Sequence, residues 1–304
     1  MMNDEFLMSK YLTVIAAGVT MGTLARIYML RADYRQYPSY PQGYLIHISL
    51  GLIAAFLGAV AVPALVAREY TAVTFLALAA QQFRDIREME RKSLENIEDT
   101  ELVPRGAAYI EDIAKAFESR NYLSIWTALA TSFVLQFFKN IGASIITGIG
   151  IMLILSLFAK RKQIKDIAVV RPAEVHFEDT LLCIENIVVM NVGLPESREI
   201  FEKKALAVMI EPRDDNARAT LANLGQRQAI VHDVAALLGV KRDITDVDFV
   251  PLARLDLETG KVGLVIVPME HDIESLIQAI NRVPVLESCR RKPLESWAGR
   301  KAAD

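Results

Sequence analysis

The chain has 304 residues, of which 52% are hydrophobic and 23% are charged, and its formal net charge is −3. A slightly acidic chain lacks the basic surface that nucleic-acid binding needs, so we expect no nucleic-acid partner. Its two cysteines, Cys183 and Cys289, are too few for a disulfide framework or a cysteine-rich metal site.

The first two long apolar runs cover residues 11–30 and 43–67. Each is long enough to cross the hydrocarbon core of a bilayer, which is roughly 30 Å thick. A signal peptide is the alternative for the first run. The segment before it contains Asp4 and Glu5, and the run is longer than a typical signal-peptide core, so we expect it to be retained as a membrane span.

The remaining apolar runs are less uniform. Residues 70–83 form a short run that continues into charged sequence, so they could cross the membrane or lie on its surface as an amphipathic helix. The runs 122–138 and 141–158 are separated only by Lys139 and Asn140, which predicts a transmembrane hairpin over residues 122–159.

Basic residues favour one orientation of these runs, because short cytoplasmic loops carry an excess of lysine and arginine. The basic loops all lie inside only if residues 70–83 also cross, which gives about five spans, an outside N-terminus and a cytoplasmic C-terminus. The sequence therefore predicts an α-helical transmembrane bundle in the cell membrane. The residues that decide this are Arg26, Arg31 and Arg35, then Arg84, Arg87, Arg91, Lys92, Arg105, Lys115 and Arg120, and finally Lys160, Arg161, Lys162 and Lys165.

Polar groups within the predicted spans lie near their ends. We expect Arg26 to reach the lipid–water interface with its long side chain, and His47 to lie at the headgroup level. Gly18 and Gly22 have the spacing that lets two helices approach closely. That spacing serves packing within one chain or a homo-oligomer, and the sequence leaves both open.

Residues 84–121 are expected to form a cytoplasmic helical segment. A charged helix continues from residue 84 until Pro104-Arg105-Gly106 ends it, and a second helix begins near Ala107. Four apolar residues of this second helix fall on one face by their spacing, which predicts an amphipathic helix; they are Tyr109, Ile110, Ile113 and Phe117.

The sequence from Tyr109 to Ala114, continued by residues 115–123, resembles the signature of the YIEGIA family of polytopic membrane proteins from endospore-forming Firmicutes. Asp112 stands where the family's name has glycine. The resemblance implies a setting, sporulation in a Gram-positive cell, and brings no catalytic residue. The motif residues are Tyr109, Ile110, Glu111, Asp112, Ile113, Ala114, Phe117, Glu118, Arg120 and Asn121.

The C-terminal part is expected to be a cytoplasmic α+β domain. Residues 160–204 are interpreted as a linker in which 169–177 and 181–192 could be strands, and residues 290–304 as a polar tail. Between them, the order of elements predicts a ferredoxin-like βαββαβ domain over residues 205–289. Its elements are strand 205–210, helix 215–238, a hairpin of 249–257 and 261–267 turning at Gly260, helix 272–281 and strand 283–287.

No recognisable catalytic motif occurs, and His176, His232 and His271 lack metal-ligand spacing, so we expect neither a metal nor a cofactor. The favoured hypothesis is a regulatory or scaffold protein that binds the lipid bilayer and a cytoplasmic protein. The alternatives are a small-solute transporter and a membrane-embedded protease or protease cofactor. For the protease, the candidate acids near the bilayer are Glu69, Glu111 and Asp112.

Overall fold

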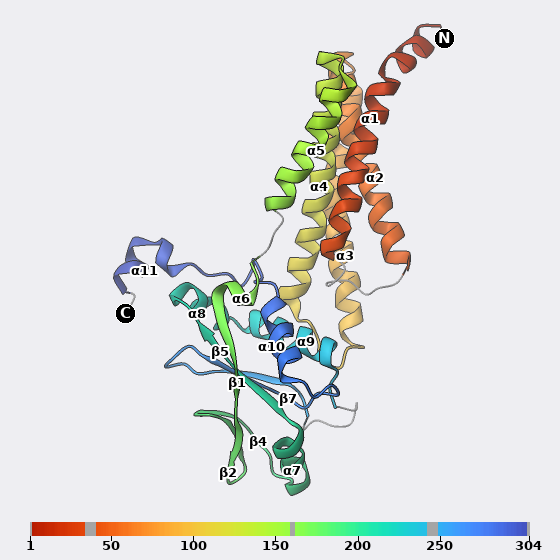
Figure 1. Cartoon of the computed structure of the whole chain (residues 1–304). Coiled ribbons are helices and arrows are strands. Elements are labelled where there is room, and N and C mark those ends of the chain that lie inside the picture. Colours follow the sequence, from red (N-terminus) through yellow and green to blue (C-terminus); the bar gives the residue numbers. More distant parts are fainter. Residues whose placement is uncertain (1, 34–40, 159–161, 242–248, 303–304) are drawn as a thin grey trace. The chain divides into compact units, whose positions relative to one another are not determined.

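The computed structural model describes residues 2–33, 41–158, 162–241 and 249–302 (Figure 1). The chain forms two compact units. Residues 1–92 and 113–160 make a helical unit, and residues 93–112 and 161–304 make an α/β unit. Of the basic residues used to orient the chain, Arg35, Lys160 and Arg161 lie outside the described residues.

Five long helices occupy the first half of the chain. They are α1 (Met2–Asp33), α2 (Pro41–Val66), α3 (Tyr70–Glu98), α4 (Ala107–Phe138) and α5 (Ile141–Phe158). The turn at Pro104-Arg105-Gly106 separates α3 from α4, as predicted. The turn at Lys139-Asn140 separates α4 from α5, and the Asn140 side chain accepts a hydrogen bond from the Ala143 N–H at 3.0 Å.

The prediction of a five-span bundle is wrong. Among the described residues, only 11–30 in α1 and 43–66 in α2 are long and apolar enough to cross a bilayer. The apolar stretch of α5, Ile141–Ile154, is shorter than the roughly 20 residues that a span needs. Residues 70–83 belong to one helix with the charged sequence up to Glu98, and the apolar part of α4 is interrupted by serine, threonine and glutamine. The distribution of basic residues favoured five spans, but it takes no account of whether each run is long and apolar enough to cross a bilayer.

Small residues bring α1, α2 and α4 into close contact. A Cβ atom added at Gly22 would lie 2.7 Å from the Cβ of Ala55, so no side chain fits there. The Ser124 hydroxyl donates to the carbonyls of Gly22 at 2.7 Å and Gly51 at 3.1 Å. The close-approach spacing of Gly18 and Gly22 is thus used for packing within the chain.

The α/β unit contains two antiparallel sheets. The four-stranded sheet has the order β1-β5-β7-β6 and the three-stranded sheet has the order β2-β3-β4. The strands are β1 (Ala168–Ala173), β2 (Val175–Glu178), β3 (Leu181–Ile184), β4 (Ile187–Asn191), β5 (Leu206–Pro212), β6 (Leu252–Leu255) and β7 (Val262–Ile266). Residues 169–177 and 181–192, for which the sequence left strand or linker open, therefore contain most of the strands β1 to β4.

The four-stranded sheet is covered on both faces. One face packs on the three-stranded sheet through a core that includes Met209, Val265, Leu182 and Ile184. Strand β5 is buried along most of its length, because helices cover its other face (Figure 1). The shorter helices of the unit are α6 (Ile164–Ile167), α7 (Pro195–Lys204), α8 (Asp215–Leu221), α9 (Leu224–Leu238), α10 (Ile273–Arg282) and α11 (Trp297–Ala302), with a 3-10 turn at Pro293–Glu295.

The predicted ferredoxin-like order is also wrong. Residues 283–287 were expected to form the last strand, but Pro284 makes only an isolated bridge with Gln163. The place beside β5 is taken by β1, whose six residues all pair with it, from Ala168 opposite Pro212 to Ala173 opposite Ala207. The predicted single helix over 215–238 is divided into α8 and α9, with Asn223 capping α9.

Candidate functional site: the signature segment

The signature segment, residues 109–121, lies in α4 and contributes to both units. Residues 109–112 belong to the α/β unit and residues 113–121 to the helical unit. The predicted apolar stripe is confirmed, because Tyr109, Ile110, Ile113 and Phe117 are all at most 2% exposed. The contacts of the two parts are described separately below.

The turn that precedes α4 is held by Glu98. Its carboxylate accepts the backbone N–H of Arg105 at 2.8 Å and of Gly106 at 2.7 Å. The Arg105 guanidinium also donates to Glu101 at 3.1 Å. Gly106 has φ +85°, a left-handed conformation that glycine adopts without strain. The turn is therefore fixed by charge-assisted hydrogen bonds and by one residue that has to be glycine.

Helix α9 binds the same turn from the side. His232 donates from Nδ1 to the Val103 carbonyl at 2.6 Å, and Gln228 donates to the Pro104 carbonyl at 2.6 Å. Burial lowers the pKa of His232, so the imidazole is held neutral with its proton on Nδ1. These two bonds satisfy backbone carbonyls that the turn leaves without helical partners.

Tyr109 bonds to α9 as well. Its hydroxyl donates to the Asp233 carboxylate at 3.1 Å, and its ring meets the His232 ring edge-on with centroids 6.2 Å apart. Burial, followed by the charge of Asp233, raises the pKa of Tyr109 well above its usual range. Tyr109 is therefore a neutral donor that fastens the start of α4 to α9.

Asp112 fastens α4 to the loop after α10. Its carboxylate is fully buried and accepts the Glu287 N–H at 3.0 Å. Gln226 holds the same loop by accepting the Leu286 N–H at 2.8 Å and donating to the Pro284 carbonyl at 3.0 Å. Burial raises the pKa of the Cys289 thiol at the end of this loop, which keeps it protonated.

In the helical unit, Phe117 lies against two polar side chains that the sequence placed at the membrane interface. The Arg26 guanidinium lies 5.7 Å from the centre of the Phe117 ring, and the His47 ring meets that ring edge-on at 4.9 Å. Arg26 also donates to Nδ1 of His47 at 3.2 Å. Arg26 is 0% and His47 is 6% exposed, so both side chains pack inside the helical unit, and their depth in a bilayer stays a prediction. The aromatic face and the imidazole provide the contacts that let the cation be buried.

The other motif residues have different surroundings. Glu118 pairs with Arg87 of α3 at 3.2 Å. Arg120 and Asn121 are buried, Ala114 is fully buried, and Glu111 is half-buried. Glu69, the remaining acid considered for a protease, lies in the exposed turn between α2 and α3. Within the α/β unit, Asp112 uses its carboxylate to accept a backbone N–H.

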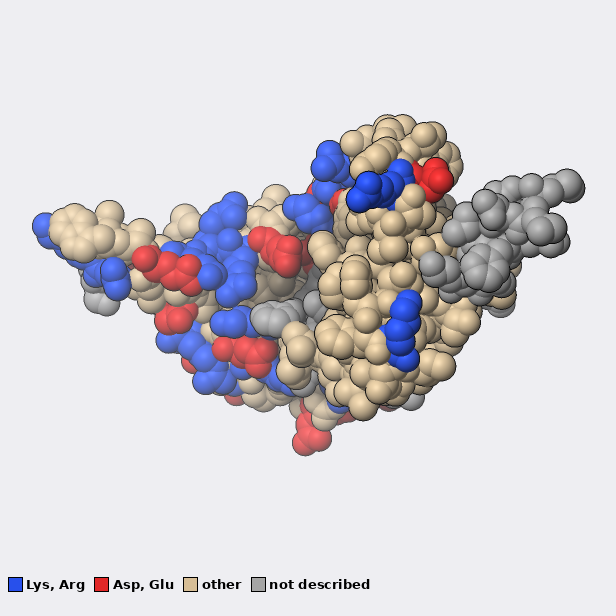
Figure 2. Space-filling view, turned by 90° about the horizontal axis from the view of Figure 1, so that it is seen from above, with Lys and Arg blue, Asp and Glu red and all other residues tan. Residues whose placement is uncertain are grey.

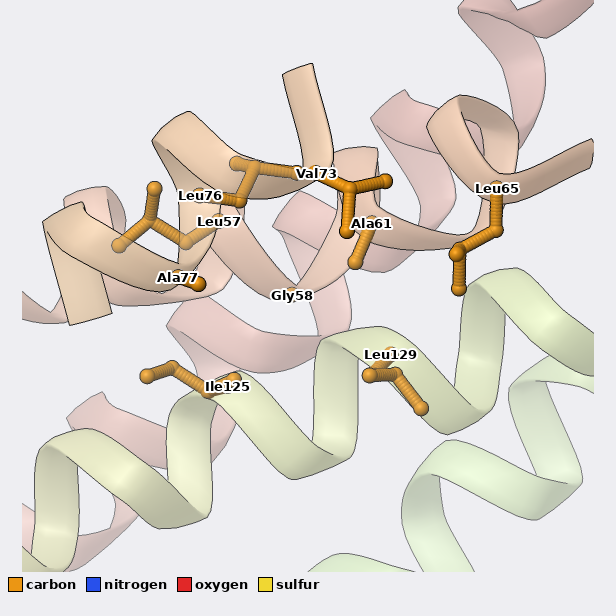
Figure 3. A pocket seen from close by; sticks show the side chains of 9 residues that line it. All are labelled: Leu57, Gly58, Ala61, Leu65, Val73, Leu76, Ala77, Ile125 and Leu129. Atoms are coloured by element: carbon orange, nitrogen blue, oxygen red, sulfur yellow. The ribbon is translucent and has the colours of Figure 1, made fainter. Parts of the chain in front are cut away.

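The helical unit also contains an apolar cavity of about 220 Å³ (Figure 3). It is lined by α2, α3 and α4, with Leu57, Val73 and Ile125 among the side chains that surround it. The lining side chains are all hydrocarbon, so they bring no group for acid–base, nucleophilic or metal chemistry. The cavity suits a hydrocarbon chain better than a polar solute.

Comparison with known proteins agrees with the signature. The family model described as "YIEGIA protein" matches residues 14–296, and the chain belongs to this family. A relative from Bacillus subtilis strain 168, named "Uncharacterized protein YphB", is 46% identical over 288 residues, which cover 95% of this chain and 97% of that protein. No solved structure matches the chain.

Sequence reasoning found the segment but missed its partners. Glu98, Gln226, Gln228, His232 and Asp233 hold the segment or the loop beside it, and only Glu98 is near in sequence. The acid at Glu98 before a Pro-Arg-Gly turn is a local signal that could have been read. The residues of α9 gave no such signal, because their roles depend on a tertiary contact across more than a hundred residues.

Proposed function

We propose that this chain is a membrane-anchored regulatory or scaffold protein, with α1 and α2 in the bilayer and the α/β unit in the cytoplasm, where it binds a protein partner. The setting is sporulation, which the family resemblance implies. Two crossings place the N-terminus on the same side as the α/β unit. The sequence predicted an N-terminus outside the cell, and that prediction depended on an odd number of spans. With two spans it no longer follows.

The observation that carries the anchor is the apolar surface of the helical unit. Large hydrophobic side chains are exposed on both proposed spans, including Leu24 in α1 and Leu45 and Phe56 in α2. In the view of Figure 2, the end of the helical bundle is mostly tan with few charges, whereas charges of both signs crowd the α/β unit. A water-soluble surface rarely exposes so much contiguous apolar area, and lipid would cover it.

The regulatory or scaffold role rests on how the α/β unit uses its polar groups. In the signature segment, Tyr109 and Asp112 bond to side-chain and backbone groups of that unit, which fits a structural fastening. The exposed face of the three-stranded sheet carries apolar side chains, Leu181 and Val188, that are 36% and 46% exposed. Such a face suits a protein partner.

The test is crosslinking of the full chain in membranes of a sporulating cell. Leu181→Asp combined with Val188→Asp should abolish capture of the partner, because two charges would then have to be desolvated at the interface. The matched control is Leu257→Asp, which changes an exposed apolar residue at the β6–β7 turn. Equal capture by the double variant and the unchanged chain would contradict the proposed partner face, provided that both reach the membrane in equal amounts.

A further inference from the structure

Three side chains with metal-binding atoms meet on the hairpin of β2 and β3. They are His176 and Glu178 of β2 and Cys183 of β3, and their ligand atoms all lie within 4.8 Å of one another. We propose that these three residues bind a divalent transition-metal ion, with Zn²⁺ the best chemical match. The site lies on the same face as Leu181 and Val188, because Glu178 is opposite Leu181 and Cys183 is opposite Val188. Its test by metal binding depends on neither the membrane anchor nor a protein partner.

Strand register explains why the three residues come together. His176 lies directly opposite Cys183 in the antiparallel pair, so their side chains project from the same face. Glu178 follows His176 by two residues and therefore shares that face. The register of β3 with β4 shifts between Leu182 and Cys183, and such bulges redirect a side chain. No local sequence spacing would have revealed this set, which is why the sequence predicted no metal.

The donor set and its dimensions fit zinc. A thiolate, an imidazole and a carboxylate are the three ligand types that Zn²⁺ takes in proteins. Tetrahedral zinc with these bond lengths separates its ligand atoms by roughly 3.3 to 3.8 Å. Nε2 of His176 already lies 3.8 Å from the Glu178 carboxylate. His176 and Glu178 are exposed, so their side chains are free to rotate toward Cys183 as an ion binds.

The three ligands leave a fourth position for water or for another donor. Cys183 is buried under its neighbours while His176 and Glu178 are exposed, so the ion would enter from the solvent side of the hairpin. Among the described residues, this is the one group of three or more histidine, cysteine and acidic side chains close enough to hold a metal ion. A bound ion would crosslink β2 to β3 and stiffen the edge of the sheet.

The experiment titrates the purified full-length chain in detergent with Co²⁺ and follows the near-ultraviolet thiolate-to-cobalt charge-transfer band. We expect a saturable band that Zn²⁺ abolishes. Cys183→Ser should remove the band, and His176→Ala or Glu178→Gln should weaken Co²⁺ binding about tenfold or more. The last two variants change exposed residues, so they test the site even if Cys183→Ser fails to fold.

The matched controls are Cys289→Ser and His271→Ala, which remove the other cysteine and another histidine of the α/β unit. Both should keep the band and the affinity of the unchanged chain. The proposal is overturned if no charge-transfer band forms, if the band persists in Cys183→Ser, or if the controls weaken binding as much as His176→Ala and Glu178→Gln do.

Discussion

At Asp112 the chain departs from the glycine in the family's name and gains a buried carboxylate. The carboxylate accepts the Glu287 N–H, so removing it would lose a hydrogen bond to a charged acceptor. The residue thus links the signature segment to a loop that follows it by 175 positions. Sequence spacing alone gives no sign of such a distant acceptor role.

We predict that Asp112→Ala destabilises the α/β unit by about 1.5–3 kcal/mol, the contribution of a hydrogen bond to a charged group. Asp112→Asn should cost less, because its amide oxygen can still accept the Glu287 N–H. Hydrogen exchange of the α/β unit in the full chain measures the difference. Glu111→Ala is the matched control, since Glu111 is the half-buried neighbour on the same helix. Equal effects at both positions would refute the role given to Asp112.

His232 makes the stability of the α/β unit depend on pH. Burial lowers its pKa in the folded chain below the ordinary value of 6.5. In the window below 6.5 the unfolded chain therefore binds more protons than the folded one, and stability falls as pH falls. Above 6.5 the stabilising contribution is fully present.

The predicted result is a lower unfolding temperature at pH 5 than at pH 7.5, with a smaller difference in His232→Gln. The glutamine amide can still donate to the Val103 carbonyl but does not titrate. Scanning calorimetry of both chains at the two pH values gives the comparison. The same pH difference in His232→Gln and in the unchanged chain would show that another group is responsible.

At the scale of elements, the sequence predicted most helix limits and failed on sheet order. The breaks at Pro104-Arg105-Gly106 and Lys139-Asn140 and the cap at Asp272 are local signals, and each helix begins or ends there. The pairing of β1 with β5 is not local, because it joins residues more than thirty positions apart. The sequence offered Val283 to Glu287 as an equally apolar candidate, and proline does not separate the two, because β1 contains Pro172 and the other candidate contains Pro284.

The turn before α4 gives a prediction about one glycine. Gly106→Ala should cost about 1–2 kcal/mol or more, because its φ is +85° and an added Cβ would lie 3.0 Å from the Gln228 side chain. Gly193→Ala is the matched control in the same unit, since an added Cβ there meets nothing within 4 Å. Hydrogen exchange around Arg105 reports the loss. A Gly106→Ala chain as protected as Gly193→Ala would refute the strain argument.

The packing of α1 on α2 gives a second prediction at this scale. Gly22→Val should separate the helices, because an added Cβ would lie 2.7 Å from Ala55 and 2.8 Å from the Ser124 carbonyl. Gly150→Val in α5 is the control, since a Cβ added at Gly150 meets nothing within 4 Å. Of the two variants, only Gly22→Val should lower the thermal unfolding temperature of the chain in detergent. Similar values for the two variants would mean that close approach at Gly22 does not support the helical unit.

At the scale of the whole molecule, composition predicted an apolar first half and a charged second half, and the structure divides the chain accordingly. It did not predict that residues 93–112 belong with the α/β unit, because that assignment follows from contacts with α9 and with the loop after α10. The number of spans was overestimated because length, hydropathy and polar interruptions all limit a crossing helix. The central proposal is that α1 and α2 anchor the chain in the membrane.

Alkaline carbonate washing of membranes from cells that make the full chain tests this anchor most directly. The chain should stay in the membrane pellet. Arginine at both Leu52 and Ile53, which are exposed on α2, should shift a large part of it to the supernatant, whereas Leu257→Arg in the α/β unit should not. Release of the unchanged chain into the supernatant would contradict the account.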